Sequence, residues 1–101
     1  MPVEILARTA RVHRQAVLQR ESDAGTVAAK KLDDEFRRRY RLLDGRAIGS
    51  ARKWAPAAYR FVPVDIYFIV WRADARRERH RVVVGILPQR MNPRRIVRSL
   101  E

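Results

Sequence analysis

Hydrophobic and polar positions follow two different periods along the chain, which divides it into a helical half and a strand half. In residues 27–43, apolar side chains recur every three or four positions with charged ones between them: Ala28, Leu32, Phe36, Tyr40 and Leu43. This spacing is typical of one face of an amphipathic helix. A preceding helix is expected over residues 9–21, with Thr9 as its N-cap. The turn residues of SDAGT separate the two, so we expect an antiparallel helical hairpin.

After residue 58 the period changes to two. YRFVPV, DIYFIVWRA and HRVVVGIL predict three strands, and the polar segment DARRE predicts a hairpin turn between the last two. Pro63 lacks an amide hydrogen, which favours an edge position for its strand. A short first strand is expected in PVEILAR. The order β-α-α-β-β-β predicts a single α+β domain over residues 1–101, with a helical hairpin packed on a small, mainly antiparallel sheet in two layers.

Both faces of the predicted sheet are apolar. Side chains alternate between the two faces along each strand. In one strand, Ile66, Phe68 and Val70 lie on one face and Tyr67, Ile69 and Trp71 on the other. In the next strand, Val82, Val84 and Ile86 lie on one face and Val83 and Leu87 on the other. A sheet covered by helices on one side only should carry polar residues on its open side. Either loops of the chain cover the second face, or a large apolar surface is exposed for another molecule. We favour a protein that functions with a partner.

The composition adds a strong positive charge. The 101 residues include 23 Lys and Arg against 11 Asp and Glu, a net charge of +12, and nearly all the cations are arginines. The planar guanidinium group pairs bidentately with carboxylate and phosphate groups. The charge therefore favours an anionic partner, either nucleic acid or an acidic protein segment. A basic surface that only contacts solvent is the alternative.

Few kinds of catalytic chemistry fit the residues present. The sequence has no cysteine and only two histidines, His13 and His80, so neither a metal site nor a cofactor is expected. It has no Ser/His/Asp arrangement and no phosphate-binding glycine loop. RNA cleavage needs less, since arginines at the strand ends can hold a phosphate. No stretch approaches the roughly 20 apolar residues of a membrane span, so a cytoplasmic protein is expected.

The order of elements and the second half of the chain resemble the ParE/RelE superfamily of bacterial toxin–antitoxin toxins. YRFVPVDIYFIVWRA is similar to a strand pair of that family in which arginines open and close the strands, here Arg60 and Arg72. RVVVGILPQRMNPRRIV resembles its last strand and tail. An R-M-D-P-like turn of ParE-type members is matched by Arg90, Met91, Asn92 and Pro93. Pro88 and Gln89 stand where those members carry a histidine.

The resemblance implies the toxin of a type II toxin–antitoxin module, which causes growth arrest and plasmid stabilisation. Such a toxin forms a hetero-oligomer with a cognate acidic antitoxin, and the pair contacts operator DNA through the antitoxin. ParE-type members inhibit DNA gyrase, whereas RelE-type members are ribosome-dependent mRNA endoribonucleases with a C-terminal tyrosine or histidine. Ile96 falls about where that tyrosine would lie, which favours a non-enzymatic gyrase inhibitor.

Two alternatives stay open beside gyrase inhibition. One is the RelE-type endoribonuclease, which would use Arg60 and Arg90. The other is a non-toxic regulatory or DNA-binding partner.

We predict two contact surfaces for a toxin of this kind. The target is expected to bind the residues after the last strand: Arg90, Met91, Arg94 and Arg95, with Met91 as an apolar anchor. The antitoxin is expected at one end and face of the preceding strand: Tyr67, Ile69, Trp71 and Arg72.

Overall fold

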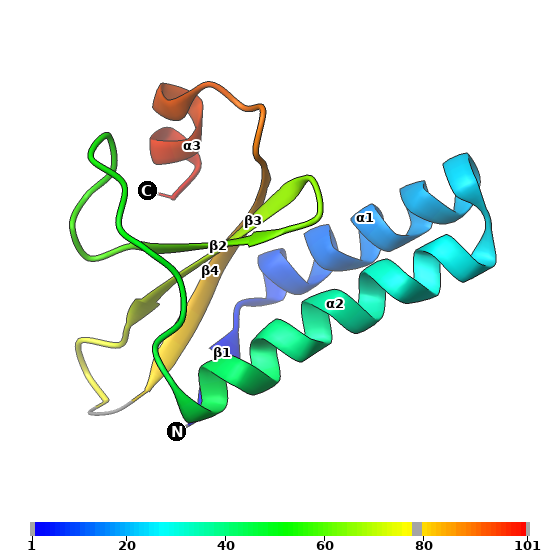
Figure 1. Cartoon of the computed structure of the whole chain (residues 1–101). Coiled ribbons are helices and arrows are strands. Elements are labelled where there is room, and N and C mark those ends of the chain that lie inside the picture. The colour runs from blue at the N-terminus through cyan, green and yellow to red at the C-terminus, as the bar shows by residue number, and fades with distance from the viewer. Residues whose placement is uncertain (1, 78–79, 101) are drawn as a thin grey trace.

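A computed structural model describes residues 2–77 and 80–100 of the protein (Figure 1). Seven elements follow in order: β1 (Val3–Ile5), α1 (Ala7–Ala24), α2 (Thr26–Gly45), β2 (Arg60–Val64), β3 (Tyr67–Ala73), β4 (Arg81–Pro88) and α3 (Pro93–Leu100). The predicted helical hairpin and all four predicted strands are present. Glu78, in the predicted DARRE turn, lies outside the described residues.

The strands form one mixed sheet in the order β1-β4-β3-β2. β1 runs parallel to β4, whereas β3 is antiparallel to both of its neighbours. β2 therefore lies at an edge, where Pro63 was expected. The fold is α+β, with two helices packed against a small mixed sheet. Among the described helices, none has the length and apolar character needed to cross a bilayer.

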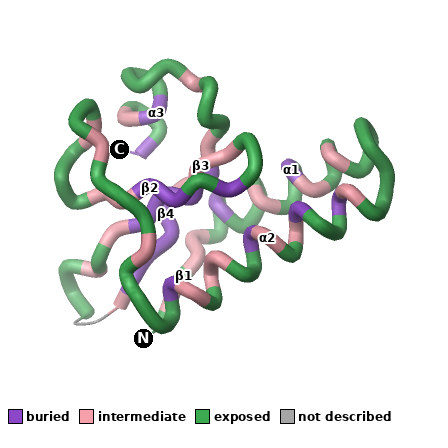
Figure 2. Tube along the Cα trace, in the orientation of Figure 1, coloured by how far each residue is buried: buried purple, intermediate pink, exposed green. Residues whose placement is uncertain are grey.

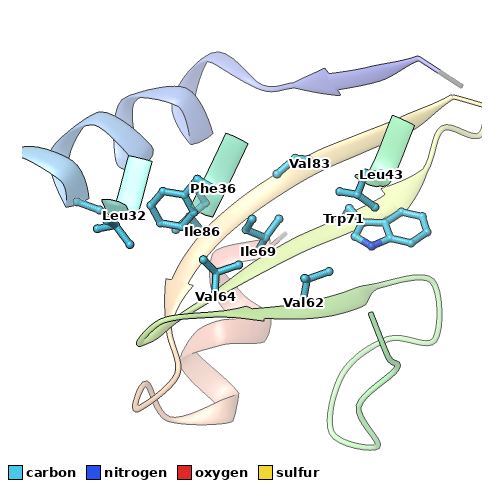
Figure 3. Close-up of a cluster of buried hydrophobic side chains, with 10 residues drawn as sticks. Leu32, Phe36, Leu43, Val62, Val64, Ile69, Trp71, Val83 and Ile86 are labelled. Atoms are coloured by element: carbon cyan, nitrogen blue, oxygen red, sulfur yellow. The ribbon is translucent and has the colours of Figure 1, made fainter. Parts of the chain in front are cut away.

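The helical hairpin of α1 and α2 covers one face of the sheet, which we call the hairpin face (Figure 1). Leu32, Phe36 and Leu43 of the predicted stripe on α2 are buried against it, and Tyr40 is partly buried. At the start of the stripe Ala29 is buried in place of the predicted Ala28. Figure 3 shows the strand residues around them: Val62, Val64, Ile69, Trp71, Val83 and Ile86. Each fully buried side chain of this size contributes roughly 1.5–3 kcal/mol to folding. This cluster is the larger of the two parts of the core.

The opposite face, which we call the α3 face, is covered by α3 and by the second part of loop 46–59, where Ala55 and Tyr59 pack against it (Figure 1). Ile96 and Leu100 are 1% and 5% exposed. They pack on one side of the strands, together with Phe61, Val70, Val82 and Val84. Figure 2 shows buried positions along both α3 and the sheet beneath it. The expectation of a large exposed apolar face is therefore wrong, because the segment after the last strand is a helix that covers it.

A β-bulge changes which side chains share a face. Val70 is paired with Gly85, but Trp71 is paired with Val83, so Val84 is the extra residue. The alternation shifts at this point. Ile86 lies on the hairpin face with Val83, and not with Val82 and Val84 as simple parity predicted, while Leu87 packs on the α3 face.

The start of α1 also differs from the prediction. Thr9 was expected to be the N-cap, but the helix begins at Ala7 and the N-cap is Leu6. Thr9 is 1% exposed inside the helix, and its hydroxyl has no hydrogen-bond partner. A pattern of helical periodicity locates a terminus only to within a few residues, since the first turn forms before the apolar stripe begins.

Candidate functional site

A cleft lies on the α3 face where loop 46–59, β3 and the turn before α3 meet. It has a volume of about 420 Å³. We call it the basic cleft, and its lining is Arg52, Trp54, Phe68, Gln89, Arg90, Met91, Asn92, Pro93 and Ile96. The lining combines two arginines with aromatic, amide and apolar side chains. Such groups bind by charge, stacking and hydrogen bonding, so the cleft is equipped for contact with an anionic molecule that also has an apolar part.

The turn that carries Arg90 is held in place by Gln89. The Gln89 side chain donates to the carbonyl oxygens of Asp65 (3.0 Å) and Tyr67 (2.8 Å). Its backbone N–H donates to Ile66 O at 2.8 Å. Gln89 therefore joins the β4–α3 turn to the β2–β3 turn, and Arg90 projects from a fixed backbone.

The N-terminus of α3 is capped by its own chain. The Arg94 N–H donates to the Asn92 side chain at 2.9 Å. The N–H groups of Arg95 and Ile96 donate to the Asn92 carbonyl oxygen at 2.9 and 3.0 Å. Pro93 occupies the first helical position, which suits its missing amide hydrogen. These three amides are used within the turn, so they are not available to an anion in the cleft.

Loop residues 46–59 are fixed against β2 beside the cleft. The Ser50 N–H donates to Phe61 O at 3.1 Å, and the Phe61 N–H donates to Ser50 O at 2.8 Å. Gly49 has a φ of 97°, and a Cβ there would lie 2.8 Å from Phe61 O. Only glycine combines that backbone conformation with so close an approach.

Arg52 and Trp54 extend from this loop into the cleft. The Arg52 guanidinium lies 5.1 Å from the centre of the Phe68 ring, a cation–π distance. Its Nε is buried and has no hydrogen-bond partner. A buried donor without an acceptor costs about 1–3 kcal/mol. The Trp54 ring packs edge-on against Phe61 at 5.2 Å and is 39% exposed.

The predicted target-binding residues divide between the cleft and the helix surface. Arg90 and Met91 line the basic cleft. Arg94 and Arg95 are exposed on the first turn of α3. Arg52 and Trp54 were not predicted as site residues. The signals in the sequence were an Arg-Lys-Trp run after Gly49 and a tryptophan that could stack on a base. A flexible basic loop has the same composition, and core packing is the commoner use of tryptophan.

Arg60 and Arg90, the predicted endoribonuclease pair, lie at opposite ends of the sheet. Arg60 opens β2 opposite Trp71, and the far end of β2 is paired with Tyr67, which in turn is paired with Pro88. The strand separates the two ends by about 13 Å. Arg60 Nη1 also donates to two carbonyl oxygens of its own loop, at 2.6 and 3.1 Å. Arg52, not Arg60, accompanies Arg90.

The four predicted antitoxin-binding residues do not form one accessible surface. Ile69 and Trp71 are 0% and 6% exposed beneath the helical hairpin, so a partner would have to displace that hairpin to reach them. Tyr67 is half-buried on the same face, with its ring 5.7 Å from that of Phe36. Arg72 alternates to the α3 face. Side-chain parity could not reveal which face the long helices occupy.

A second polar cluster lies between α1 and α2. The two nitrogens of His13 contact Tyr40 Oη (2.9 Å) and Asp33 Oδ1 (2.7 Å), and Arg37 Nε donates to Asp33 at 2.8 Å. These residues line a cavity of about 300 Å³. Burial raises the pKa of Tyr40, so its hydroxyl stays protonated. Burial opposes ionisation of Asp33, but hydrogen bonds from Arg37 and His13 lower its pKa overall. The cluster joins the two helices.

Within residues 2–77 and 80–100, no three His, Asp or Glu side chains gather in a way that could hold a metal ion. In comparisons with known proteins, no protein-family model matches the chain, and no curated protein matches it in sequence.

Proposed function

We propose that this protein is the toxin of a type II toxin–antitoxin module, acting in the cytoplasm by binding DNA gyrase. Two observations support the proposal. The element order and the R-M-N-P turn resemble the ParE/RelE superfamily and match its ParE branch best. The same turn carries Arg90 and Met91 into the basic cleft.

The cleft is the single observation on which the proposal depends most. It brings Arg90 and Met91 together with Arg52 and Trp54 in one concave surface. The chemistry of these side chains is that of contact: charge pairing, stacking and apolar packing. That combination suits a toxin that arrests a protein–DNA complex by binding to it.

A cognate antitoxin is the second part of the proposal. The net charge of +12 favours an acidic partner. A groove of about 180 Å³ between α1 and α3 is lined by apolar residues of β4 and by Arg8. A groove of this size and composition can take one apolar side chain of an amphipathic acidic segment, with a carboxylate of that segment near Arg8. The groove and the positive charge therefore support an antitoxin partner. The sheet face does not support one, because α3 covers it.

The proposal is tested with a supercoiling assay on purified gyrase. We expect the wild-type protein to inhibit supercoiling at micromolar concentration and to stabilise cleaved DNA. R90A/M91A should lose most of this inhibition, whereas R38A/L18A, which changes an exposed pair on the helical hairpin, should keep it. A folded wild-type protein without effect at micromolar concentration would contradict the proposed target.

The two alternatives predict other outcomes. A ribosome-dependent endoribonuclease would give codon-phased cuts in translated mRNA by primer extension. The separation of Arg60 from Arg90 does not favour it. A non-toxic regulatory or DNA-binding partner would leave growth unaffected when it is induced alone.

A further inference from the structure

The basic cleft combines a phosphate-binding part with a base-binding part. We propose that it binds one unpaired nucleotide of a nucleic-acid strand, with the base against Trp54 and the adjacent phosphates on Arg52 and Arg90. This goes beyond the proposed function, because binding to a free strand requires neither gyrase nor an antitoxin.

The arginines supply the phosphate-binding part. Arg52 lines the cleft, and its guanidinium group is held over the Phe68 ring at 5.1 Å. Arg90 projects from the turn that Gln89 fixes through three hydrogen bonds. No Asp or Glu is among the residues that line the cleft, so neither guanidinium is neutralised there. Guanidinium groups fixed in this way bind phosphate bidentately.

Trp54 supplies the base-binding part. It is the more exposed of the two tryptophans, at 39%, against 6% for Trp71. Base–aromatic stacking tolerates any base sequence, because every base has a π-face. The volume of about 420 Å³ lies in the range of small-molecule pockets, which suits one nucleotide and not a duplex. A base has to leave its stack to reach such a ring.

The lining favours a nucleotide over an acidic peptide. A peptide carboxylate would pair with Arg52 and Arg90 but would leave Trp54 and Met91 without a planar apolar partner. A nucleotide uses both parts of the cleft at once. A peptide site is therefore the competing outcome that the experiment has to separate.

The experiment measures fluorescence anisotropy of labelled 12-mers of dT and of rU, titrated with the purified full chain. We expect micromolar binding at low salt, and a loss of at least ten-fold in R52Q/R90Q. The slope of log affinity against log salt should decrease by about 1.4, from two phosphate contacts at about 0.7 each on a single strand. The charge-matched control R38Q/R41Q, on exposed positions of α2, should change affinity by less than three-fold.

A second variant tests the base. W54L should weaken binding to dT several-fold but leave binding to an abasic strand of equal length unchanged. Photo-crosslinking of a bromouridine-containing strand to wild-type protein should label Trp54, which needs no variant to fold. Preference for dT or for rU identifies the natural strand, and either one supports the site.

Three results would overturn the inference. The first is an equal loss of affinity in R52Q/R90Q and R38Q/R41Q, which would mean that the strand binds through the overall positive charge of the protein alone. The second is a polyglutamate peptide that binds as tightly through the same two arginines. The third is crosslinking elsewhere than at Trp54. Binding of the 12-mer and inhibition of supercoiling are measured separately, so a negative result for the nucleotide site does not contradict the gyrase proposal, nor the reverse.

Discussion

The two faces of the sheet are covered by very different amounts of structure. Helices of 18 and 20 residues cover the hairpin face, whereas an eight-residue helix and loop 46–59 cover the α3 face. The long helices enclose the larger part of the core. The short cover leaves the basic cleft open beside it. We infer that the hairpin face provides most of the stability and that the α3 face provides the binding surface.

Arginines on the two faces differ in the same way. Arg81 is 9% exposed on the hairpin face, where it donates to the Leu43 carbonyl oxygen at the end of α2 and lies 5.7 Å from the Trp71 ring. A cation at a helix C-terminus is favourable. Arg94 and Arg95, on α3, are exposed to solvent. The arginine on the hairpin face therefore contributes to packing, whereas the two arginines on α3 remain available for contact with another molecule.

The largest expected effect is on the hairpin face. Phe36 is fully buried beneath three strands, so F36A should lower the free energy of unfolding by about 3–5 kcal/mol. Urea denaturation followed by circular dichroism measures this. A cost below 1.5 kcal/mol would show that the hairpin face is not the main source of stability.

A smaller effect is expected from the matching substitution on the α3 face. I96A removes a side chain that is 1% exposed, but its cover is a single short helix, so we expect about 2–3 kcal/mol. I96A should also weaken binding of the dT or rU 12-mer at the basic cleft, because Ile96 lines that cleft. F36A should leave binding of the 12-mer unchanged when it is measured under conditions in which the variant is still folded. Equal binding in both variants would contradict the division between the faces.

Much of the hairpin face could be predicted from the sequence, and much of the α3 face could not. The apolar period of α2 runs from Ala28 to Leu43, about four helical turns, which fixes Leu32 and Phe36 on one side without any tertiary information. The segment after Asn92 is short and rich in arginine, so its few apolar positions, Ile96 and Leu100 among them, gave too weak a period to predict a helix. The composition of that segment is equally typical of a solvated tail.

The bulge and the cleft could not be predicted for related reasons. Nothing local to RVVVGIL states which residue is extra, because the bulge is defined by pairing with β3. Arg90 and Met91 were predicted from the turn that contains them. Arg52 and Trp54 reach the cleft only because Ser50 pairs with Phe61, a contact between segments that the sequence does not relate.

The polar cluster between the helices gives a pH-dependent effect of moderate size. The pKa of Asp33 is held below its ordinary value of 3.8, so the folded state binds the proton more weakly than the unfolded state. The stability that this carboxylate contributes is complete above pH 3.8 and is lost as the pH falls towards the lower folded-state pKa. D33N should cost about 1 kcal/mol at neutral pH and reduce the loss in acid.

Asp34 offers a control next to Asp33 in the chain. It forms only an exposed ion pair with Lys30 at 3.1 Å, so D34N should cost less than about 0.5 kcal/mol. Some acid dependence should persist in D33N, because a hydrogen bond from Arg20 also lowers the pKa of Asp65. Acid titrations of unfolding that coincide for D33N and the wild type would contradict the role of the His13 cluster.

The smallest expected effect concerns the link between the two faces. Arg20, on α1, forms two hydrogen bonds with the Asp65 carboxylate at 2.8 and 3.2 Å, and the Asp65 carbonyl oxygen accepts from Gln89 in the turn before Arg90. Because the ion pair is partly exposed, R20Q should cost only about 0.5 kcal/mol. Binding of the dT or rU 12-mer should nevertheless weaken by two- to three-fold, since the turn that presents Arg90 loses its connection to the helical hairpin. R14Q removes a charge from the same helix without touching Asp65, and it should leave binding unchanged. Equal binding in the two variants would mean that the cleft is organised by the α3 face alone.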